Sequence, residues 1–189
     1  TITSTTRMIF LESPTNPLIK VIDLPTISKH IKANYPNLIS VFDNTMMSPL
    51  LLTPLDYIDI QYESATKYLN GHHDIMAGVI ATRSKKLSDD VFYVINATGS
   101  GLAPFDSWLL LRGLKTLSLR FERQQENTVK TANWLESIGL SVRYPGLKSP
   151  PHYQLHTSST KGFAAVLYFE TGLIKTSQVV SEHTKPFSV

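Results

Sequence analysis

The chain has 189 residues, of which 42% are hydrophobic and 17% charged, with a formal net charge of +3 and no cysteine. This composition is typical of one globular domain, or of one domain and part of a second. The lack of cysteine excludes disulfides, a thiolate nucleophile and a cysteine-ligated zinc site. No apolar run reaches the roughly 18 residues that a membrane-spanning helix needs, and the scattered basic residues do not favour nucleic acid or a membrane surface as a partner.

Four short apolar runs predict the strands of a sheet in the first part of the chain. They cover residues 8–12, 38–42, 58–62 and 77–82. Nearly every position in them is apolar, as expected for strands that are covered on both faces. A helix is predicted from Pro25, near its first position, to about Ala33. The sequence therefore predicts an α/β fold, with a mostly parallel sheet and helices on both of its faces.

The apolar spacing changes to three and four residues in the second part. It predicts a helix over 104–137, or two helices broken near residues 113–116, because Gly113 weakens a helix. Gly139 is typical of the residue that follows a helix. Residues 141–144 and 163–169 predict strands of a smaller α+β domain. The basic cluster at 83–86 is interpreted as a turn between a strand and a helix.

The ends of the chain indicate an internal piece of a longer protein. The first residues run almost at once into an apolar strand, and residues 187–189 resemble a strand cut in mid-course. No charged-then-apolar leader opens the chain. We expect a cytoplasmic protein, with peroxisome and plastid left open.

Lys67 lies in the sequence Ser-Ala-Thr-Lys-Tyr-Leu-Asn-Gly-His, residues 64–72. A lysine behind two hydroxyl residues can form an imine with an aldehyde cofactor whose phosphate is held by those hydroxyls. Pyridoxal phosphate enzymes need this arrangement, because the lysine and the phosphate contacts must lie within one cofactor length. The alternative is a solvated lysine in a polar loop.

Polar side chains end three of the predicted strands. Glu12 ends the first, Asp43 follows the second, and Ser64, Thr66 and Lys67 follow the third. Ligands bind beyond the carboxyl ends of strands in open parallel sheets. A carboxylate at Asp43 would favour a protonated pyridine nitrogen, although an aspartate here could also be a helix N-cap. Its pairing with Lys67 favours the cofactor interpretation.

Three blocks, residues 12–17 (Glu-Ser-Pro-Thr-Asn-Pro), 43–45 (Asp-Asn-Thr) and 64–72, resemble the Cys/Met-metabolism family of pyridoxal phosphate enzymes. This family includes cystathionine lyases and synthases and methionine γ-lyase. The resemblance implies the aspartate-aminotransferase-like fold, called fold type I. It also implies that residues 1–117 are the C-terminal part of the large cofactor-binding domain. Residues 118–189 would be a linking helix and the first part of the small domain.

The same resemblance implies a role for each matching residue. Lys67 would be the imine lysine and proton shuttle, and Asp43 would pair with the pyridine nitrogen. Ser64 and Thr66 would hold the phosphate. Asn16 would lie near the 3′-oxygen of the cofactor, and Glu12 would support the edge of the site. The phosphate loop and the ring-stacking tyrosine of the family fall upstream of this chain, and the arginine that binds the substrate carboxylate falls downstream.

Further blocks at 99–106, 111–117 and 123–127 are similar to the eukaryotic members that cleave cystathionine by β-elimination to homocysteine, pyruvate and ammonia. The implied partners are a small sulfur amino acid as substrate and further copies of the chain in a homotetramer. A γ-lyase, a γ-synthase or methionine γ-lyase stays open, as does a truncated scaffold without activity. No metal is expected, because the adjacent His72 and His73 lack a third ligand.

Overall fold

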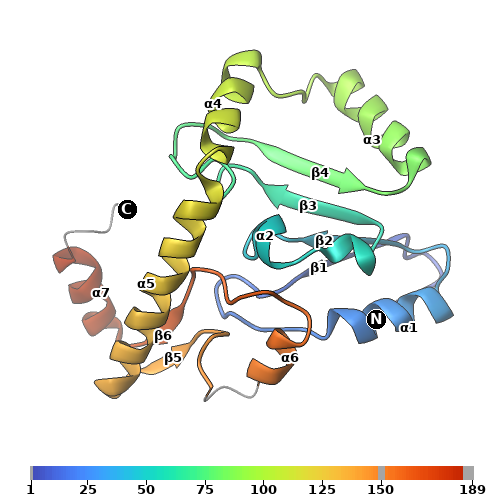
Figure 1. Cartoon of the computed structure of the whole chain (residues 1–189). Helices are drawn as coiled ribbons and strands as arrows, with labels where there is room; N and C mark the ends of the chain where they lie inside the picture. Colours follow the sequence, from blue (N-terminus) through green and yellow to red (C-terminus); the bar gives the residue numbers. More distant parts are fainter. Residues whose placement is uncertain (1, 149–151, 185–189) are drawn as a thin grey trace.

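The computed structural model describes residues 2–148 and 152–184, which form a four-stranded sheet and a separate two-stranded sheet (Figure 1). The strands of the larger sheet, in spatial order, are β1 (Met8–Glu12), β2 (Ile39–Asp43), β3 (Ile60–Ser64) and β4 (Gly78–Thr82). The first three are parallel, and β4 is antiparallel to β3. The prediction of a mostly parallel sheet within an α/β fold is confirmed.

The third strand lies two residues later than predicted, so Glu63 and Ser64 are its last residues rather than the start of a loop. The reversed direction of β4 was not predicted either. A parallel strand needs a crossover connection, usually a helix. Residues 65–77 form turns around Lys67 instead and contain no helix that could return the chain along the sheet.

Helix α1 (Leu24–Asn34) connects β1 and β2, as predicted. Asp23 caps its N-terminus, because its side chain accepts a hydrogen bond of 3.0 Å from the backbone N–H of Thr26. Leu24 and Ile31 bury the apolar face of the helix. Two short elements, the helix α2 (Ser48–Leu51) and the 3-10 helix η1 (Pro54–Asp56), connect β2 to β3.

The predicted long helix is broken at the predicted place, into α4 (Pro104–Leu114) and α5 (Leu117–Ser137). Gly139 follows α5 with a φ of +87°, and its N–H donates to the carbonyl of Glu136 at 2.9 Å. This is the left-handed end that a glycine favours. The basic cluster is a strand-to-helix turn, as predicted. Ser84 caps the helix that follows it, α3 (Lys85–Thr98).

The smaller sheet pairs β5 (Ser141–Arg143) with β6 (Tyr168–Glu170) in antiparallel fashion. Helices α6 (Tyr153–Thr157) and α7 (Ile174–His183) complete this part. The predicted strand at 163–169 was largely wrong. Phe163 and Ala164 lie in a loop, where the Phe163 N–H donates to Oε1 of Gln125 at 2.8 Å and Ala164 has a φ of +62°. The apolar side chains at the start of this run pack against the rest of the chain from a loop and not from a strand. The strand expected at 187–189 lies outside the described residues.

Helix α5 contributes to two apolar clusters. Near its start, Phe121 packs with Leu24 and Phe42 of the larger sheet region. Further along, Ala132 and Leu135 pack with residues that surround the smaller sheet, Val142, Tyr144 and Leu147. The expected boundary between two domains at residue 117 stays a prediction. Figure 1 shows α5 running past the carboxyl ends of β2 and β3 toward β5 and β6.

Large apolar side chains remain exposed on α3 and α4, among them Phe92, Phe105, Trp108 and Leu111. None of the helices in residues 2–148 and 152–184 is both long and apolar enough to span a membrane.

Candidate active site at the carboxyl edge of the sheet

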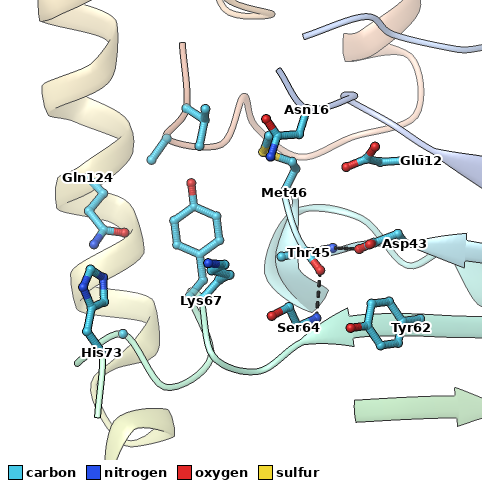
Figure 2. Close-up of a pocket in the computed structure, with 14 residues that line it drawn as sticks. Glu12, Asn16, Asp43, Thr45, Met46, Tyr62, Ser64, Lys67, His73 and Gln124 are labelled. Atoms are coloured by element: carbon cyan, nitrogen blue, oxygen red, sulfur yellow. Dashed lines mark hydrogen bonds between the residues drawn. The ribbon is translucent and has the colours of Figure 1, made fainter. Parts of the chain in front are cut away.

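A cavity of about 550 Å³ lies at the carboxyl ends of β1, β2 and β3. Glu12, Asp43 and Ser64, the last residues of these strands, line it together with Lys67 and Asn16. The parallel register explains this convergence, because Glu12 lies directly opposite Asp43 across the β1–β2 pair. Figure 2 shows these side chains around the cavity. Five of the six predicted site residues therefore line one cavity.

The turn after β2 is fixed to the end of β3 by hydrogen bonds. The backbone N–H of Thr45 donates to Oδ1 of Asp43 at 2.9 Å. The Thr45 hydroxyl accepts from the backbone N–H of Ser64 at 2.8 Å (Figure 2). The carboxylate of Asp43 is therefore held in place by its own turn, and that turn is held by the next strand.

Lys67 lies in a tight turn that follows β3 directly. Its backbone N–H donates to the carbonyl of Ser64 at 3.2 Å, and its carbonyl accepts from the N–H of Gly71 at 2.7 Å. The side chain lines the cavity, and in residues 2–148 and 152–184 no ion pair to its amine is found. A cationic or nucleophilic nitrogen thus faces the cavity, with no partner carboxylate in the described part of the chain.

Glu12 lies close to the carboxylate of Asp43. Burial raises the pKa of the Glu12 carboxyl, the backbone N–H of Asn16 offsets part of this rise, and the negative charge of Asp43 adds to it. Asn16 comes from the loop after β1, which the N–H of Thr15 closes by donating to the carbonyl of Lys20 at 2.9 Å. The first strand therefore brings a carboxyl and an amide to the rim of the cavity.

Thr66 is the predicted site residue that does not line the cavity. Its hydroxyl accepts a hydrogen bond of 2.9 Å from the backbone N–H of Ala77. It also donates a hydrogen bond of 3.3 Å to the carbonyl of Ala77. These contacts connect the Lys67 turn to the segment before β4. The role of Thr66 in holding a phosphate stays a prediction.

Sequence reasoning missed several residues that line the cavity. They include Thr45, Met46, Tyr62, Tyr68, His73 and Gln124. Gln124 comes from α5, far from the strand ends in sequence, and its Oε1 is buried without a hydrogen-bond partner among the described residues. Thr45 could have been found, because it directly follows Asp43. The placement of Gln124 depends on how α5 crosses the sheet, which no local motif encodes.

A buried polar cluster lies next to the cavity residues. Glu63 is 2% exposed, and its Oε1 accepts hydrogen bonds from the side-chain amides of Asn44 (2.9 Å) and Gln61. Burial raises the pKa of Glu63 to about 7, although both amides counteract the rise, and the charge of Asp43 contributes to it. Among the described residues no group of three histidine, aspartate or glutamate side chains could hold a metal ion.

The family model for the Cys/Met metabolism PLP-dependent enzymes matches residues 1–189. The chain belongs to this family. It is 53% identical over 185 residues to cystathionine β-lyase from Neurospora crassa, covering 97% of this chain and 40% of the relative. It is 49% identical to cystathionine β-lyase from Saccharomyces cerevisiae, covering 90% of this chain and 39% of that relative.

A similar solved structure is cystathionine γ-lyase from Lactobacillus plantarum in complex with L-serine. It has a TM-score of 0.92 and 38% identity, over 100% of this chain and 50% of that one. The chain thus spans about two fifths of the length of the curated relatives and half of this neighbour. Both the family of pyridoxal phosphate enzymes and the fold type I expected from the sequence are confirmed.

Proposed function

We propose that this chain is part of a pyridoxal phosphate-dependent carbon–sulfur lyase that cleaves cystathionine by β-elimination to homocysteine, pyruvate and ammonia. The observation that carries this proposal is the convergence of Lys67, Asp43 and Ser64 on one cavity. The family supports the cofactor, and the β-lyases of N. crassa and S. cerevisiae support the substrate.

The residues of the cavity fit the cofactor by their chemistry. An amine without a carboxylate partner, an oriented carboxylate and a hydroxyl lie around one space of suitable size. Pyridoxal phosphate bound there would supply a protonated pyridine ring that accepts electrons from the substrate. Because Thr45 occupies Oδ1 of Asp43, the second carboxylate oxygen is the one assigned to the pyridine N–H. The negative charge favours the protonated form of that nitrogen.

Lys67 is assigned two tasks. Its ε-amine would hold the aldehyde of the cofactor, and Nζ, once free, would accept the proton from the substrate Cα. The turn from Ser64 to Gly71 fixes the backbone of Lys67, so the two tasks require motion of the side chain alone. Ser64 is assigned to the phosphate, together with Thr66. Asn16 is assigned to the 3′-oxygen, and Glu12 to the edge of the ring.

Product analysis tests the reaction. The full-length protein is incubated with cystathionine, and pyruvate plus homocysteine are the expected products. 2-Oxobutyrate plus cysteine would instead show γ-cleavage, a second candidate that the L. plantarum γ-lyase, at 38% identity, favours. A control with Lys67→Ala distinguishes enzymatic cleavage from cleavage by free cofactor.

A scaffold without catalytic activity is the remaining alternative from the sequence. The visible absorbance of the full-length protein after addition of pyridoxal phosphate distinguishes the two. A band that disappears in Lys67→Ala supports the enzyme, and the absence of a band in the wild-type protein supports a scaffold.

We further propose that the full-length protein forms a homotetramer in the cytoplasm. The exposed apolar side chains of α3 and α4, such as Phe92, Phe105 and Trp108, are surfaces that association would cover. Sedimentation of the full-length protein tests the tetramer, and imaging of a tagged copy in cells tests the compartment, for which peroxisome and plastid stay open.

A further inference from the structure

Arg120, in the first turn of α5, points its guanidinium at backbone carbonyls. Nη1 and Nη2 each donate to the carbonyl of Tyr68 at 3.2 Å, and Nη2 also donates to the carbonyls of Gly113 at 2.9 Å and Leu69 at 3.5 Å. Nε donates to the hydroxyl of Thr116 at 3.0 Å. No ion pair to Arg120 is found among the described residues. The positively charged guanidinium therefore interacts with the carbonyls of peptide groups.

Two of these carbonyls belong to the turn that carries Lys67. Tyr68 and Leu69 directly follow Lys67, and the turn ends at Gly71, which has a φ of +72°. The last carbonyls of a helical turn have no partner within the turn, and a cationic side chain stabilises them. Arg120 thus supplies, from 52 positions further along the chain, the donors that this turn lacks.

Two glycines make room for this contact. A Cβ on Gly71 would lie 1.8 Å from Nη1 of Arg120, so the guanidinium lies directly against the backbone of Gly71. A Cβ on Gly113 would lie 2.3 Å from the carbonyl oxygen of Asn70. The end of α4, the start of α5 and the Lys67 turn therefore pack together at backbone distance.

Phe121, the residue after Arg120, also contacts this turn. The ring of Phe121 meets that of Tyr68 edge-on, with the centroids 4.6 Å apart. Tyr68 is thus held through its carbonyl by Arg120 and through its ring by Phe121. Both contacts come from the start of α5, so this helix fixes the position of the turn relative to the sheet.

We propose that Arg120 is a positioning residue for Lys67: it holds the turn that aims the lysine amine at the cavity shared with Asp43 and Ser64. The proposal rests on the proposed function of Lys67. The planar guanidinium reaches three carbonyls and the Thr116 hydroxyl at once through a rigid fork of donors, a geometry that the compact ammonium of a lysine does not reproduce. Burial lowers the pKa of Arg120, in agreement with a partly dehydrated cation whose hydrogen bonds are strong.

The first test does not depend on cofactor or substrate. Hydrogen exchange of the backbone amides of Asn70 and Gly71, which close the turn, is measured in the full-length protein without cofactor, for the wild type, Arg120→Ala and Arg120→Lys. We expect at least tenfold faster exchange in Arg120→Ala and a smaller rise in Arg120→Lys. The matched control is Arg123→Ala on the same helix, whose side chain is 70% exposed and pairs with Glu126. Unchanged exchange in Arg120→Ala would overturn the proposal.

The second test uses kinetics of the loaded enzyme. Arg120→Ala is expected to lower kcat at least tenfold with KM within about twofold, because the substrate contacts stay and the amine is misplaced. Millimolar guanidinium added to Arg120→Ala should restore part of kcat and slow the exchange at Gly71 again. A loss confined to KM, or a lack of rescue in both readouts, would contradict a positioning role. If the wild type shows no cofactor band, the proposed function fails, whereas the exchange result still decides the role of Arg120 in the turn.

Discussion

At the scale of single residues, Asp43 and Ser64 end neighbouring strands but have different tasks in the proposed site. Asp43 brings a charge that is oriented by the N–H of Thr45. Ser64 brings a neutral hydroxyl, which we propose as one of several groups that would bind the phosphate. In the proposed site this charge of Asp43 would act on the electron-accepting ring, and electrostatic stabilisation is usually the largest contribution to catalysis.

Asp43→Ala in the full-length protein should therefore lose much more turnover than Ser64→Ala. We expect a loss of about 100-fold or more in kcat for Asp43→Ala, as for other lost electrostatic contacts, and a loss of roughly tenfold or less for Ser64→Ala. The measurement is kcat at saturating cofactor and substrate. Equal losses in the two variants would mean that Asp43 has only a structural role.

Glu63 should make the stability of the folded protein depend on pH. Its pKa is raised from 4.5 to about 7 in the folded state, so the folded protein holds this proton more tightly than the unfolded chain does. The stabilisation of the folded state by this proton is fully present below about pH 4.5 and is lost as the pH rises through about 7. At about 1.4 kcal/mol per pKa unit, the loss is on the order of 3 kcal/mol.

Glu63→Gln should remove this dependence. The melting temperature of the full-length variant, relative to that of the wild type, is expected to be higher at pH 8 than at pH 5. Glu122→Gln, an exposed position on α5, is the control and should follow the wild type. Parallel curves for Glu63→Gln and the wild type would show that Glu63 is not protonated in the folded state.

At the scale of elements, the strands and the break between α4 and α5 followed from the sequence, because apolar runs and Gly113 report local structure directly. The loop at 163–167 did not, since its apolar residues pack against α5 and the smaller sheet without joining a strand. Thr66 shows the same limit at the site. The resemblance implied a phosphate contact for Thr66, which stays a prediction, whereas the hydrogen bond between its hydroxyl and the backbone of Ala77 was not foreseen. Such contacts depend on elements that lie far apart in sequence.

The contact between the Lys67 turn and α5 can be tested with two glycines. Gly71 and Gly99 both have positive φ, +72° and +67°, but a Cβ on Gly99 would meet nothing within 4 Å. Because a Cβ is disfavoured in a left-handed backbone, each Gly→Ala change is expected to lower the free energy of unfolding by about 1–2 kcal/mol. Gly71→Ala should lower the free energy of unfolding clearly more than Gly99→Ala does, because the new Cβ would displace the guanidinium of Arg120. The difference in melting temperature between the two variants measures this, and equal values would argue against the contact.

At the scale of the whole molecule, the chain carries Lys67 and Asp43, the residues proposed to act on the cofactor, but covers only 40% of the N. crassa relative. Charge-assisted hydrogen bonds to a phosphate contribute about 1.5–3 kcal/mol each. The resemblance to the family implies a phosphate loop outside the residues of this chain, and we expect that loop to supply two or three such bonds. That difference corresponds to several orders of magnitude in affinity.

The 189-residue chain alone is therefore expected to bind pyridoxal phosphate weakly and to associate through exposed apolar side chains such as Phe92 and Trp108. A cofactor titration with sedimentation, beside the Lys67→Ala variant, measures both properties. Tight, saturable binding by a monomer that depends on Lys67 would show that the remaining segments contribute little.

Lys67 is the residue that we propose to bond to the cofactor. The most direct measurement is borohydride reduction of the full-length protein loaded with pyridoxal phosphate, followed by mass spectrometry of its peptides. We expect one modified lysine, Lys67, in the peptide that spans the turn after β3. Stable modification of another lysine with Lys67 unmodified, or no modification at all, would contradict it.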